Sequence, residues 1–351
     1  MKILHIADIH LGAEPDKDKP WGAGRGNLQW DAFAMAIQAA EQQKVDLLLI
    51  AGDLFHRQPL KRELKEVNYM LSRLTRAKVV LMAGNHDYIS ASSFYRSFDW
   101  NENIFFLESE EMKCIEFPEL SAFVYGFSYE HREIRENRYC KIEKQGRGYH
   151  ILLAHGGDET HVPISLRQLK ELEFDYIAMG HIHKPQQLLE NRIVMAGALQ
   201  PLDCNETGSH GYWITELKKG EASTIFYPIR GCEYVEVEIC MEKHMTNRQL
   251  QTLVQSRIEA LASYQLAYIK LTGIYEPELA PDVTALEAME RVAKVDVLCK
   301  PDYDFDKLKG EYSNQILGRY ISKIEQMPQS EITRRALYLG VEALMSDFEV
   351  Y

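Results

Sequence analysis

Short apolar segments that each end in a polar motif most constrain the fold of this chain. Residues 2–7 form the first such segment, and the motif D-I-H at 8–10 follows it directly. Residues 45–50 form the second, and they lead into G-D at 52–53. Apolar runs of this length indicate buried strands. Residues 27–43 between them have apolar side chains at helical spacing, so the order of strand, helix and strand predicts parallel crossovers and an α/β core.

Further strands are predicted along the rest of the first 230 residues. They are expected at residues 79–82, 103–107, 122–126, 150–154, 176–179, 192–195, 212–217 and 223–227. A charged helix is expected at residues 61–76, but little helix lies between the later strands. A two-sheet α/β sandwich flanked by helices therefore fits this pattern better than a single doubly wound sheet.

The pattern changes after Gly231. Strands at 234–240, 267–271 and 295–298, with helices at 247–262 and 283–293, predict a smaller α+β module. Two terminal helices follow, for which Ser313 and Ser330 are candidate N-caps. We therefore expect three parts, at residues 1–230, 231–300 and 301–351.

The composition indicates a globular protein outside the membrane. The chain is 46% hydrophobic and 26% charged, which is ordinary for a globular protein. It has no apolar run of the roughly 18 residues that a membrane span needs, and its start lacks the features of a signal peptide. We expect a cytoplasmic protein with no membrane partner. The six cysteines are scattered without a C-x-x-C pair, which favours free thiols.

The formal charge does not identify the substrate. The chain has a net charge of −12, which by itself argues weakly against a nucleic-acid partner. Residues 232–351 hold 13 Lys and Arg against 20 Asp and Glu, so much of the excess lies in the last third. Several acids of the first part are candidate metal ligands, whose charge bound cations would offset.

Five polar motifs, each after a predicted strand, carry the chemistry. They are D-x-H at 8–10, G-D-x-x-H at 52–56, G-N-H-D at 84–87, H-G at 155–156 and G-H-x-H at 180–183. The carboxyl ends of strands are where open α/β sheets bind ligands. On an extended backbone, residues two apart project to the same side. The polar residues of D-x-H and G-H-x-H are thus expected to face one site, with Ile9 and Ile182 facing the core.

The motifs supply seven candidate metal ligands of mixed type. Two carboxylates, one amide oxygen and four imidazoles suit Mn²⁺, Fe²⁺ or Zn²⁺ better than Mg²⁺ or Ca²⁺. Seven ligands are too many for one metal and suit two metals that share a bridging carboxylate. Paired metals about 3.5–4 Å apart activate phosphoryl centres. We expect two divalent ions, Mn²⁺ foremost, held by Asp8, His10, Asp53, Asn85, His155, His181 and His183.

In this order the motifs resemble the calcineurin-like metallophosphoesterase superfamily, over about residues 1–230. The segments I-L-H-I-A-D-I-H-L-G at 3–12 and A-G-D-L-F-H at 51–56 resemble its DNA repair exonuclease branch, which holds SbcD- and YhaO-like nuclease subunits. Residues 231–300 resemble the capping domain of those nucleases. The resemblance implies that Asp53 bridges the metals, one of which also takes Asp8, His10 and His183, and the other Asn85, His155 and His181.

The resemblance also implies three catalytic residues. His86 would face the phosphate, where it would stabilise the developing charge or protonate the leaving oxygen. Asp87 would orient the His86 imidazole. His56 would lie near the substrate.

These expectations lead to one favoured function and two rivals. The favoured function is a metal-dependent phosphodiesterase that acts on DNA, as an exonuclease or endonuclease subunit of a DNA repair complex. Its partners would be DNA and an SMC-like ATPase bound through the helices of residues 301–351, and a homodimer is compatible with the same family. The first rival is a small-molecule or phosphoprotein phosphatase. The second is an inactive scaffold, against which the complete ligand set argues.

Two segments and three histidines have alternative interpretations. Residues 15–26 form a loop that could meet substrate through Trp21, or an ordinary surface loop. Basic residues recur through 130–147, either as a phosphate-contacting edge or as a solvated helix with ion pairs. The isolated His5 and His150 favour structural roles, and His161 could be structural in the same way or could support a metal ligand.

Overall fold

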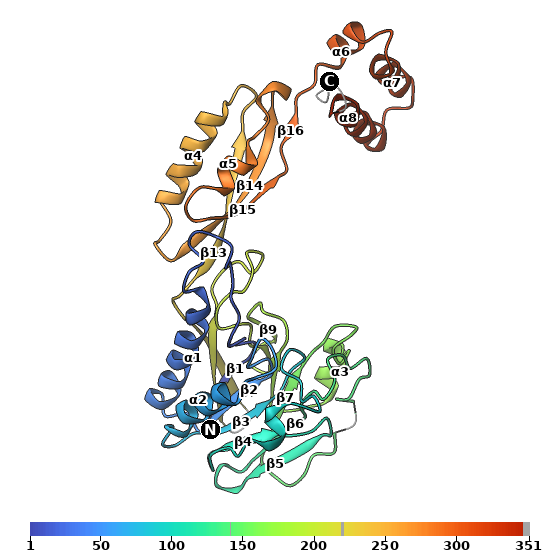
Figure 1. Ribbon diagram of the computed structural model, residues 1–351. Helices are drawn as coiled ribbons and strands as arrows, with labels where there is room; N and C mark the ends of the chain where they lie inside the picture. The colour runs from blue at the N-terminus through green and yellow to red at the C-terminus, as the bar shows by residue number, and fades with distance from the viewer. Residues whose placement is uncertain (141, 219–220, 347–351) are drawn as a thin grey trace. The chain divides into compact units, whose positions relative to one another are not determined.

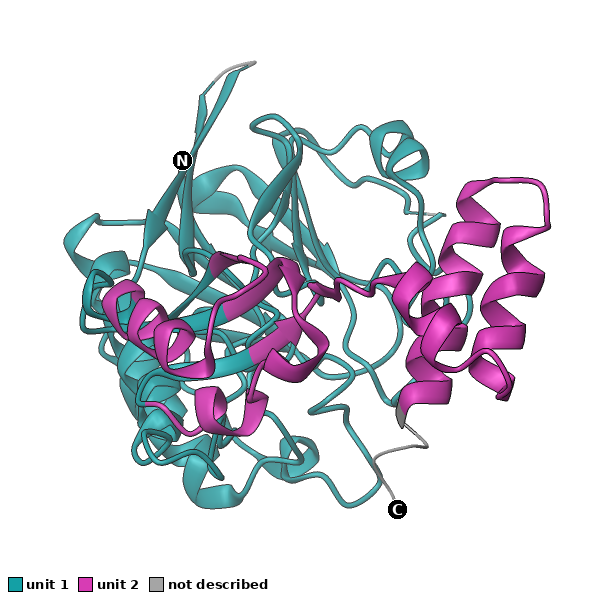
Figure 2. Ribbon diagram, turned by 90° about the horizontal axis from the view of Figure 1, so that it is seen from above, with its two compact units in different colours: residues 1–236, 258–268, 290–294 teal, residues 237–257, 269–289, 295–351 magenta. Residues whose placement is uncertain are grey.

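The computed structural model describes residues 1–140, 142–218 and 221–346 (Figure 1). Two compact units form within the chain (Figure 2). The first contains residues 1–236, 258–268 and 290–294, and the second contains 237–257, 269–289 and the chain from 295 onward.

The first sheet of the first unit has the order β12-β11-β1-β2-β3-β4. Strands β1 to β4 run parallel, and β11 pairs antiparallel with both β1 and β12. All five residues of β2 are buried, as expected for a parallel strand covered on both faces. The strands are β1 (Lys2–Ile6), β2 (Leu47–Ala51), β3 (Lys78–Met82), β4 (Ile104–Leu107), β11 (Gly211–Lys218) and β12 (Glu221–Pro228).

The helices α1 (Arg25–Gln42) and α2 (Lys61–Ser72) cover one face of this sheet. Phe33 of α1 and Leu64 of α2 belong to the same apolar cluster as Ile50 of β2. Their spacing along each helix gives one apolar stripe, which is buried only when it faces the sheet.

The second sheet has the order β5-β6-β7-β8-β10-β9. Strands β6, β7, β8 and β10 are parallel, whereas the edge strands β5 and β9 are antiparallel to their neighbours. A second apolar cluster joins Leu49 and Val80 of the first sheet to Ile151 and Ala178 of the second. The strands are β5 (Lys113–Phe117), β6 (Ala122–Gly126), β7 (Tyr149–His155), β8 (Tyr176–Gly180), β9 (Gln186–Leu189) and β10 (Ile193–Met195).

The shared apolar cluster makes the two sheets a sandwich, which confirms the predicted fold class. A third cluster, with Tyr125 and Phe174, covers the outer face of the second sheet. Three short helices complete this region: α3 (Leu166–Glu171) and the 3₁₀ turns η1 (Phe94–Ser97) and η2 (Pro118–Leu120).

A third sheet has the order β13-β14-β15, with β16 paired to β14. Its strands are β13 (Glu233–Met241), β14 (Gln265–Tyr275), β15 (Val292–Val297) and β16 (Lys300–Pro301). The helices α4 (Asn247–Glu259) and α5 (Val283–Glu287) and the turn η3 (Pro277–Leu279) accompany it. This is the mixed α+β character that the sequence predicts.

Three helices follow: α6 (Phe305–Glu311), α7 (Ile316–Glu325) and α8 (Glu331–Ser346). Leu317 and Ile321 of α7 and Val341 of α8 are fully buried against one another in a small apolar cluster of their own. The sequence predicts two helices here, so α6 is an additional element. Residues 347–351 of the predicted helical segment lie outside the described residues.

Several predicted boundaries are wrong for identifiable reasons. Helix α1 begins at Arg25, two residues before the predicted start at Asn27, because Gly24, with φ of 86°, turns the chain just before it. The N-cap of α7 is Gln315, so the predicted N-cap Ser313 is wrong. The predicted N-cap Ser330 is right, because its hydroxyl accepts from the Thr333 amide at 3.2 Å.

Other corrections concern the type of element. The predicted helix at 283–293 ends at Glu287, and β15 begins at Val292. The edge strands β5 and β9 were not predicted, because their polar, partly exposed sequences lack a buried apolar run. Residues 130–147, where described, form no helix.

The cysteines and the helices can be compared with what the composition suggests. All six cysteines are free thiols. Among the described residues, no helix combines the length and the apolar character needed to cross a bilayer.

Candidate metal centre

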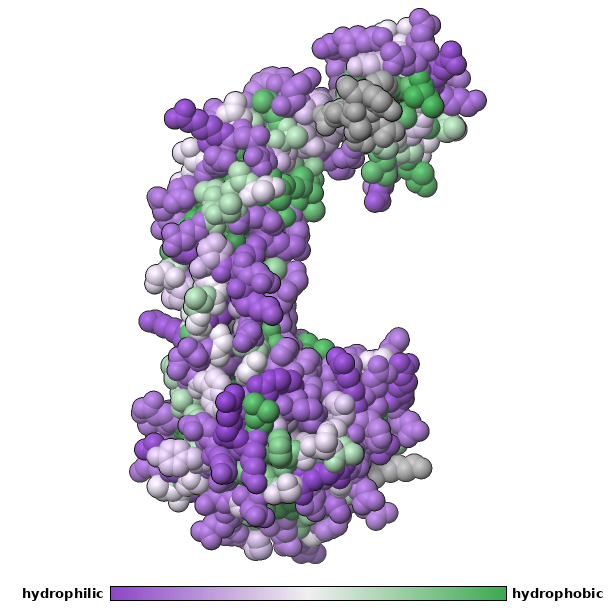
Figure 3. Space-filling view, viewed as in Figure 1, coloured by the Kyte–Doolittle hydropathy of each residue, from purple (hydrophilic) through white to green (hydrophobic). Residues whose placement is uncertain are grey.

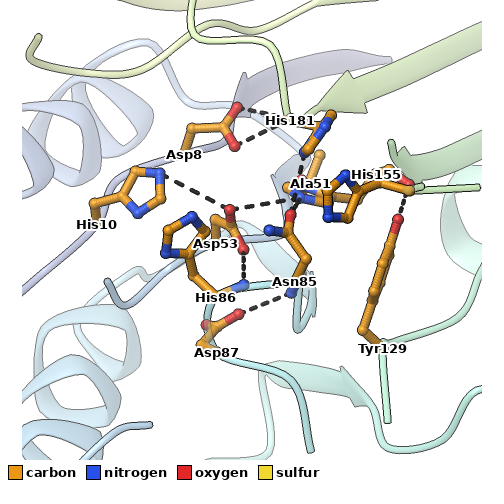
Figure 4. Close-up of polar contacts among 12 residues, drawn as sticks. Asp8, His10, Ala51, Asp53, Asn85, His86, Asp87, Tyr129, His155 and His181 are labelled. Carbon is orange, nitrogen blue, oxygen red and sulfur yellow. Dashed lines mark hydrogen bonds and ion pairs between the residues drawn. The ribbon is translucent and has the colours of Figure 1, made fainter. Parts of the chain in front are cut away.

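The seven predicted ligands meet at one edge of the sandwich. Figure 4 shows Asp8, His10, Asp53, Asn85, His155 and His181 there. They follow β1, β2 and β3 of the first sheet and end β7 and follow β8 of the second. In both sheets these strands are parallel, so their carboxyl ends lie at the same edge. Registers such as Ala51 opposite Met82 and His155 opposite Gly180 bring the motifs level with one another.

Left-handed backbone conformations aim several of these side chains. Asp8, His10, Asp53 and His181 have φ of 50°, 51°, 48° and 102°, values that residues other than glycine rarely adopt. Such conformations cost about 1–3 kcal/mol each and occur where the surrounding structure imposes them, often at functional sites. The expectation of an extended backbone at the D-x-H motif is therefore wrong, although its polar residues do share one site.

The isoleucines between the ligands differ from each other. Ile9 is 1% exposed and belongs to the core, as predicted. Ile182 is 40% exposed, so the prediction that it faces the core is wrong. Backbone hydrogen bonds hold the first segment in place, since the amide of Asp8 donates to Gly52 at 3.1 Å and that of His10 donates to Asp53 at 3.1 Å.

The first group of donor atoms comes from Asp8, His10 and His183. The Nε2 atoms of His10 and His183 lie 3.0 Å apart. Ligand atoms of all three residues lie within 4.8 Å of one another. Two ligands of one metal, each about 2.0–2.2 Å from it, are separated by roughly 3–3.5 Å. This group therefore has the spacing of a metal site.

The second group comes from Asn85, His155 and His181. Oδ1 of Asn85 lies 2.9 Å from Nε2 of His155 and 3.1 Å from Nδ1 of His181. Asp53 lies between the groups, with its Oδ2 atom 3.8 Å from Nε2 of His10 and 3.6 Å from Nε2 of His155. The geometry is that of two neighbouring sites that share one carboxylate.

The charges of the site fit a pair of divalent cations. Burial raises the pKa of Asp8 to about 8 and also raises the pKa of Asp53, and a bound cation would favour the ionised form of both carboxyl groups. Burial lowers the pKa of His10 well below its usual range, that of His155 to about 3 and that of His181 to about 4. These imidazoles are therefore neutral, as metal ligands must be.

His183 differs from the other imidazoles. Burial lowers its pKa, but the hydrogen bond with Glu206 and the charge of Asp8 outweigh that effect and raise the pKa to about 9. The acidic surroundings that hold a proton on this ring also favour a metal cation at the same position.

The three predicted catalytic residues lie beside the ligands. The amide of His86 donates to Oδ1 of Asp53 at 2.9 Å, and its Nδ1 lies 3.2 Å from the carbonyl oxygen of His56. The ring centroids of His86 and His10 are 4.8 Å apart. Nδ1 of His56 lies 3.4 Å from Nδ1 of His10, and burial lowers the pKa of His56.

The carboxylate of Asp87 is fully buried and has three donors, none of which is the His86 imidazole. It accepts from the amides of Gly84 at 2.8 Å and Phe55 at 3.2 Å, and from the hydroxyl of Tyr95 at 2.8 Å. Asp87 therefore ties the loop that carries Asn85 and His86 to the segment after β2.

Sequence reasoning missed two carboxylates that contact the ligands. Oδ2 of Asp158 lies 2.6 Å from Nε2 of His181, and Oε1 of Glu206 lies 2.7 Å from Nδ1 of His183. Asp158 stands three residues after His155, which is the one sequence signal that could have suggested it. Glu206 lies in a loop without a motif.

The two segments with alternative interpretations, residues 15–26 and 130–147, have mainly structural contacts. Trp21 packs against an apolar cluster that includes Tyr234, so it does not form the tip of a free loop. In residues 130–147, Arg135 pairs with Glu133 at 2.7 Å, which matches the ion-pair interpretation without the helix; Lys141 lies outside the described residues.

The isolated histidines have local partners. Nδ1 of His5 lies 3.1 Å from the Tyr176 hydroxyl, and Nδ1 of His150 lies 3.2 Å from the Tyr125 hydroxyl. Nδ1 of His161 lies 2.8 Å from the carboxylate of Asp158, which itself contacts His181.

Comparisons with known proteins identify the family. Calcineurin-like phosphoesterases match residues 1–185 of the chain. A protein of Bacillus subtilis (strain 168), named as the uncharacterized metallophosphoesterase YhaO, is 28% identical over 276 residues, or 70% of this chain. That match covers 65% of the relative's own length, slightly less than two thirds.

Two solved structures are also similar. The protein TT1561 of Thermus thermophilus aligns over 64% of this chain and 98% of its own, with a TM-score of 0.39 and 12% identity. A dimetal phosphatase from Danio rerio aligns over 65% of this chain and 99% of its own, with a TM-score of 0.40 and 13% identity.

The family match covers more than half of the chain, and the chain belongs to the calcineurin-like phosphoesterase family. Metal-dependent hydrolysis of phosphoester bonds is the activity that membership of this family implies. The superfamily predicted from the five motifs is confirmed. The family uses a dinuclear metal centre, and the structure holds clusters of side chains that could bind metal ions, among them Asp8, His10 and His183.

Proposed function

We propose that this chain is a two-metal phosphodiesterase that cleaves DNA, acting in the cytoplasm as the nuclease subunit of a DNA repair complex with Mn²⁺ as its metal. The observation that carries the phosphoesterase chemistry is the convergence of all seven ligands beside His86. The chemistry that two divalent ions supply when bound is Lewis-acid activation of a phosphoryl group and of water. Asp53 would serve both ions.

The assignment of the ligands follows the two groups of donors. Asp8, His10 and His183 would hold one ion with Asp53, and Asn85, His155 and His181 would hold the other with Asp53.

His86 is the residue that we assign to the leaving oxygen. The carbonyl oxygen of His56, 3.2 Å from Nδ1 of His86, can only accept a hydrogen bond. Nδ1 therefore donates to it, and Nε2 is the nitrogen available to the substrate. A proton on Nε2 would stabilise the developing charge or pass to the leaving oxygen. Asp87 contributes by fixing the backbone of the loop that carries His86.

Cationic side chains beside His56 support a polyanionic substrate. A surface pocket of about 380 Å³ is lined by Gly12, Glu14, Lys17, His56 and Arg57. Lys17 is exposed, and Arg57 is held in place by Glu63 at 2.7 Å. We propose that Lys17 and Arg57 contact a phosphate next to the one that is cleaved, which requires a substrate with more than one phosphate.

The part of the chain beyond the phosphoesterase match also supports a large substrate. The family match ends at residue 185, yet a third sheet and the helices α4 to α8 follow. A phosphatase for small esters needs no such addition. By its resemblance to repair nucleases, we propose that this region handles DNA and a partner.

The terminal helices are the part that we propose binds an SMC-like ATPase. Ile316 is 66% exposed, Ile332 is 81% exposed and Leu339 is 56% exposed, although α7 and α8 bury a small core of their own. Hydrophobic side chains gather on these helices in Figure 3. Exposed apolar groups of this size on a short helical segment favour a protein contact.

The function is tested with the purified chain, Mn²⁺ and three substrates: linear DNA, an aryl phosphodiester and an aryl phosphomonoester. We expect metal-dependent cleavage of DNA and of the diester, with DNA cleavage falling steeply as salt rises because phosphate contacts release counterions. Asp53→Asn, prepared in parallel, controls for contaminating nucleases. Activity on the monoester alone, with intact DNA at low salt, would favour the phosphatase.

A matched pair of variants tests the neighbouring phosphate contact. Lys17→Gln should raise KM for DNA and leave hydrolysis of the aryl diester unchanged, because the aryl ester has a single phosphate. Lys65→Gln removes an exposed lysine of α2 and should change neither reaction. An equal effect of the two variants on DNA cleavage would remove Lys17 from the binding surface.

A further inference from the structure

The two histidines of the G-H-x-H motif present different nitrogens to the metal centre. His181 directs Nδ1 toward Oδ1 of Asn85, at 3.1 Å. His183 directs Nε2 toward Nε2 of His10, at 3.0 Å. The opposite nitrogens, Nε2 of His181 and Nδ1 of His183, therefore point away from the centre.

Each outward nitrogen meets a carboxylate. Oδ2 of Asp158 lies 2.6 Å from Nε2 of His181, and Oε1 of Glu206 lies 2.7 Å from Nδ1 of His183. An ionised carboxylate can only accept, so the outward nitrogen carries the proton in both rings. The inward nitrogen of each ring is then the one that would bind a metal, which at His183 would displace the second proton of the ring. In their metal-binding forms the two histidines would be opposite tautomers, each of which suits its own side of the centre.

Asp158 is itself anchored. Its Oδ1 atom accepts from the amides of Thr160 at 2.7 Å and His161 at 2.9 Å. Nδ1 of His161 lies 2.8 Å from Oδ2. Gly157, with φ of 124°, turns the loop just before Asp158, a conformation that few other residues adopt. The carboxylate is therefore a fixed support for His181.

Glu206 is anchored more simply. Its Oε2 atom accepts from the amide of Leu202 at 3.0 Å, while Oε1 faces His183. The side chain is 19% exposed, which limits competition from water. Both carboxylates thus have one oxygen fixed by backbone amides and the other directed at a histidine.

We propose that Asp158 and Glu206 are positioning residues, each dedicated to one of the two metal sites. Asp158 orients His181 for the site of Asn85 and His155, and Glu206 orients His183 for the site of Asp8 and His10. Removal of such a partner typically weakens metal binding about 10–100-fold. The two sites can therefore be weakened one at a time. This inference rests on the metal centre and does not require DNA as the substrate.

The test uses the full chain without substrate. Metal-free protein is titrated with Mn²⁺ by calorimetry, and Mn²⁺ EPR separates protein with two coupled ions from protein with one. Asp158→Ala and Glu206→Ala should each leave one site close to wild type and weaken the other about 10–100-fold. Asp158→Asn, whose amide oxygen can still accept the His181 proton, should retain part of the lost affinity.

The variants should also locate the weakened site. Addition of His155→Ala should leave the strong Mn²⁺ site of Asp158→Ala unchanged, because that site is the one of Asp8, His10 and His183. In Glu206→Ala the same substitution should remove the one site that still binds Mn²⁺ tightly. The exposed neighbour Glu159, changed to Gln, is the matched control and should bind two ions as wild type does. Circular dichroism verifies that each variant is folded.

Three results would overturn the proposal. Two Mn²⁺ ions bound at wild-type affinity in both alanine variants would show that the carboxylates are dispensable. Equal weakening of both sites by either variant would contradict the separate assignment. Three ions in the wild type and two in Asp158→Ala would instead make Asp158, His161 and His181 a third metal site. None of these readouts depends on DNA cleavage, so failure of the proposed function leaves a different signature.

Discussion

Gly84 offers a test of how tightly the metal centre is built. A Cβ atom added at this residue would lie 2.2 Å from Oδ1 of Asp53, 2.6 Å from its amide nitrogen and 2.8 Å from Nε2 of His155. The contacted groups are buried, with Asp53 2% exposed and His155 0% exposed. Gly84→Ala therefore forces one methyl group into space that two metal ligands already occupy.

The size of the effect follows from these distances. Contacts of carbon with oxygen or nitrogen below 3.0 Å are essentially not seen, so Asp53 or the loop must move by roughly 1 Å. Overpacking of this kind typically costs about 1–3 kcal/mol of folding free energy. A ligand or reacting group displaced by about 1 Å can cost 10²-fold in rate. We expect Gly84→Ala to lower both the free energy of unfolding and the affinity for metal.

Denaturant unfolding of the metal-free protein measures the first effect, and Mn²⁺ titration measures the second. Gly310→Ala is the control, because a Cβ atom at that helical position meets nothing within 4 Å. Alanine is favoured over glycine inside a helix by about 0.5–1 kcal/mol, so the control should be neutral or slightly stabilising.

The reasoning fails if Gly84→Ala binds two ions with wild-type affinity and unfolds at the wild-type denaturant concentration. That result would mean that the loop yields without moving Asp53. A loss of stability with unchanged metal binding would place the displacement in the backbone and away from the ligands.

Four further outcomes are expected. Asp53→Asn should lower the occupancy of both metals, measured by elemental analysis, and two tightly bound ions with full activity would contradict its bridging role. His86→Ala should keep both ions and lose about 10²–10⁴ in rate, whereas loss of metal would make it a ligand. Tyr95→Phe leaves the buried Asp87 without one donor and should lower the free energy of unfolding by about 1–3 kcal/mol in urea. A chain that ends at Lys300 should keep metal-dependent nuclease activity but no longer co-purify with the ATPase; equal recovery of both complexes would refute the docking role.

Much of the fold and the ligand set can be predicted from the sequence because their signals are local. The strand β2 is a run of five apolar residues, and its neighbour β3 is apolar in four of its five residues. The ligands follow such runs within a few residues. Since the carboxyl ends of parallel strands gather at one edge, residue type and position after a strand were enough to predict which side chains would meet.

Edge strands and the ends of helices carried no such local signal in the sequence. The strand β9 has polar residues and partial exposure, and so has no buried run to reveal it. The helix predicted at 283–293 had suitable periodicity, yet its last residues pair as β15, because sheet contacts distant in sequence outweigh local preference.

The tertiary structure alone decided how the ligands are oriented. The left-handed backbone at Asp8 and Asp53 is imposed by neighbouring segments, and it replaces the extended geometry that the spacing suggested. The partners of His181 and His183 lie 23 residues away in each case, in loops without regular structure. Residue types and spacings state which groups can bind a metal, but the choice of nitrogen on each ring depends on a hydrogen bond that forms only when the two sheets and their loops come together.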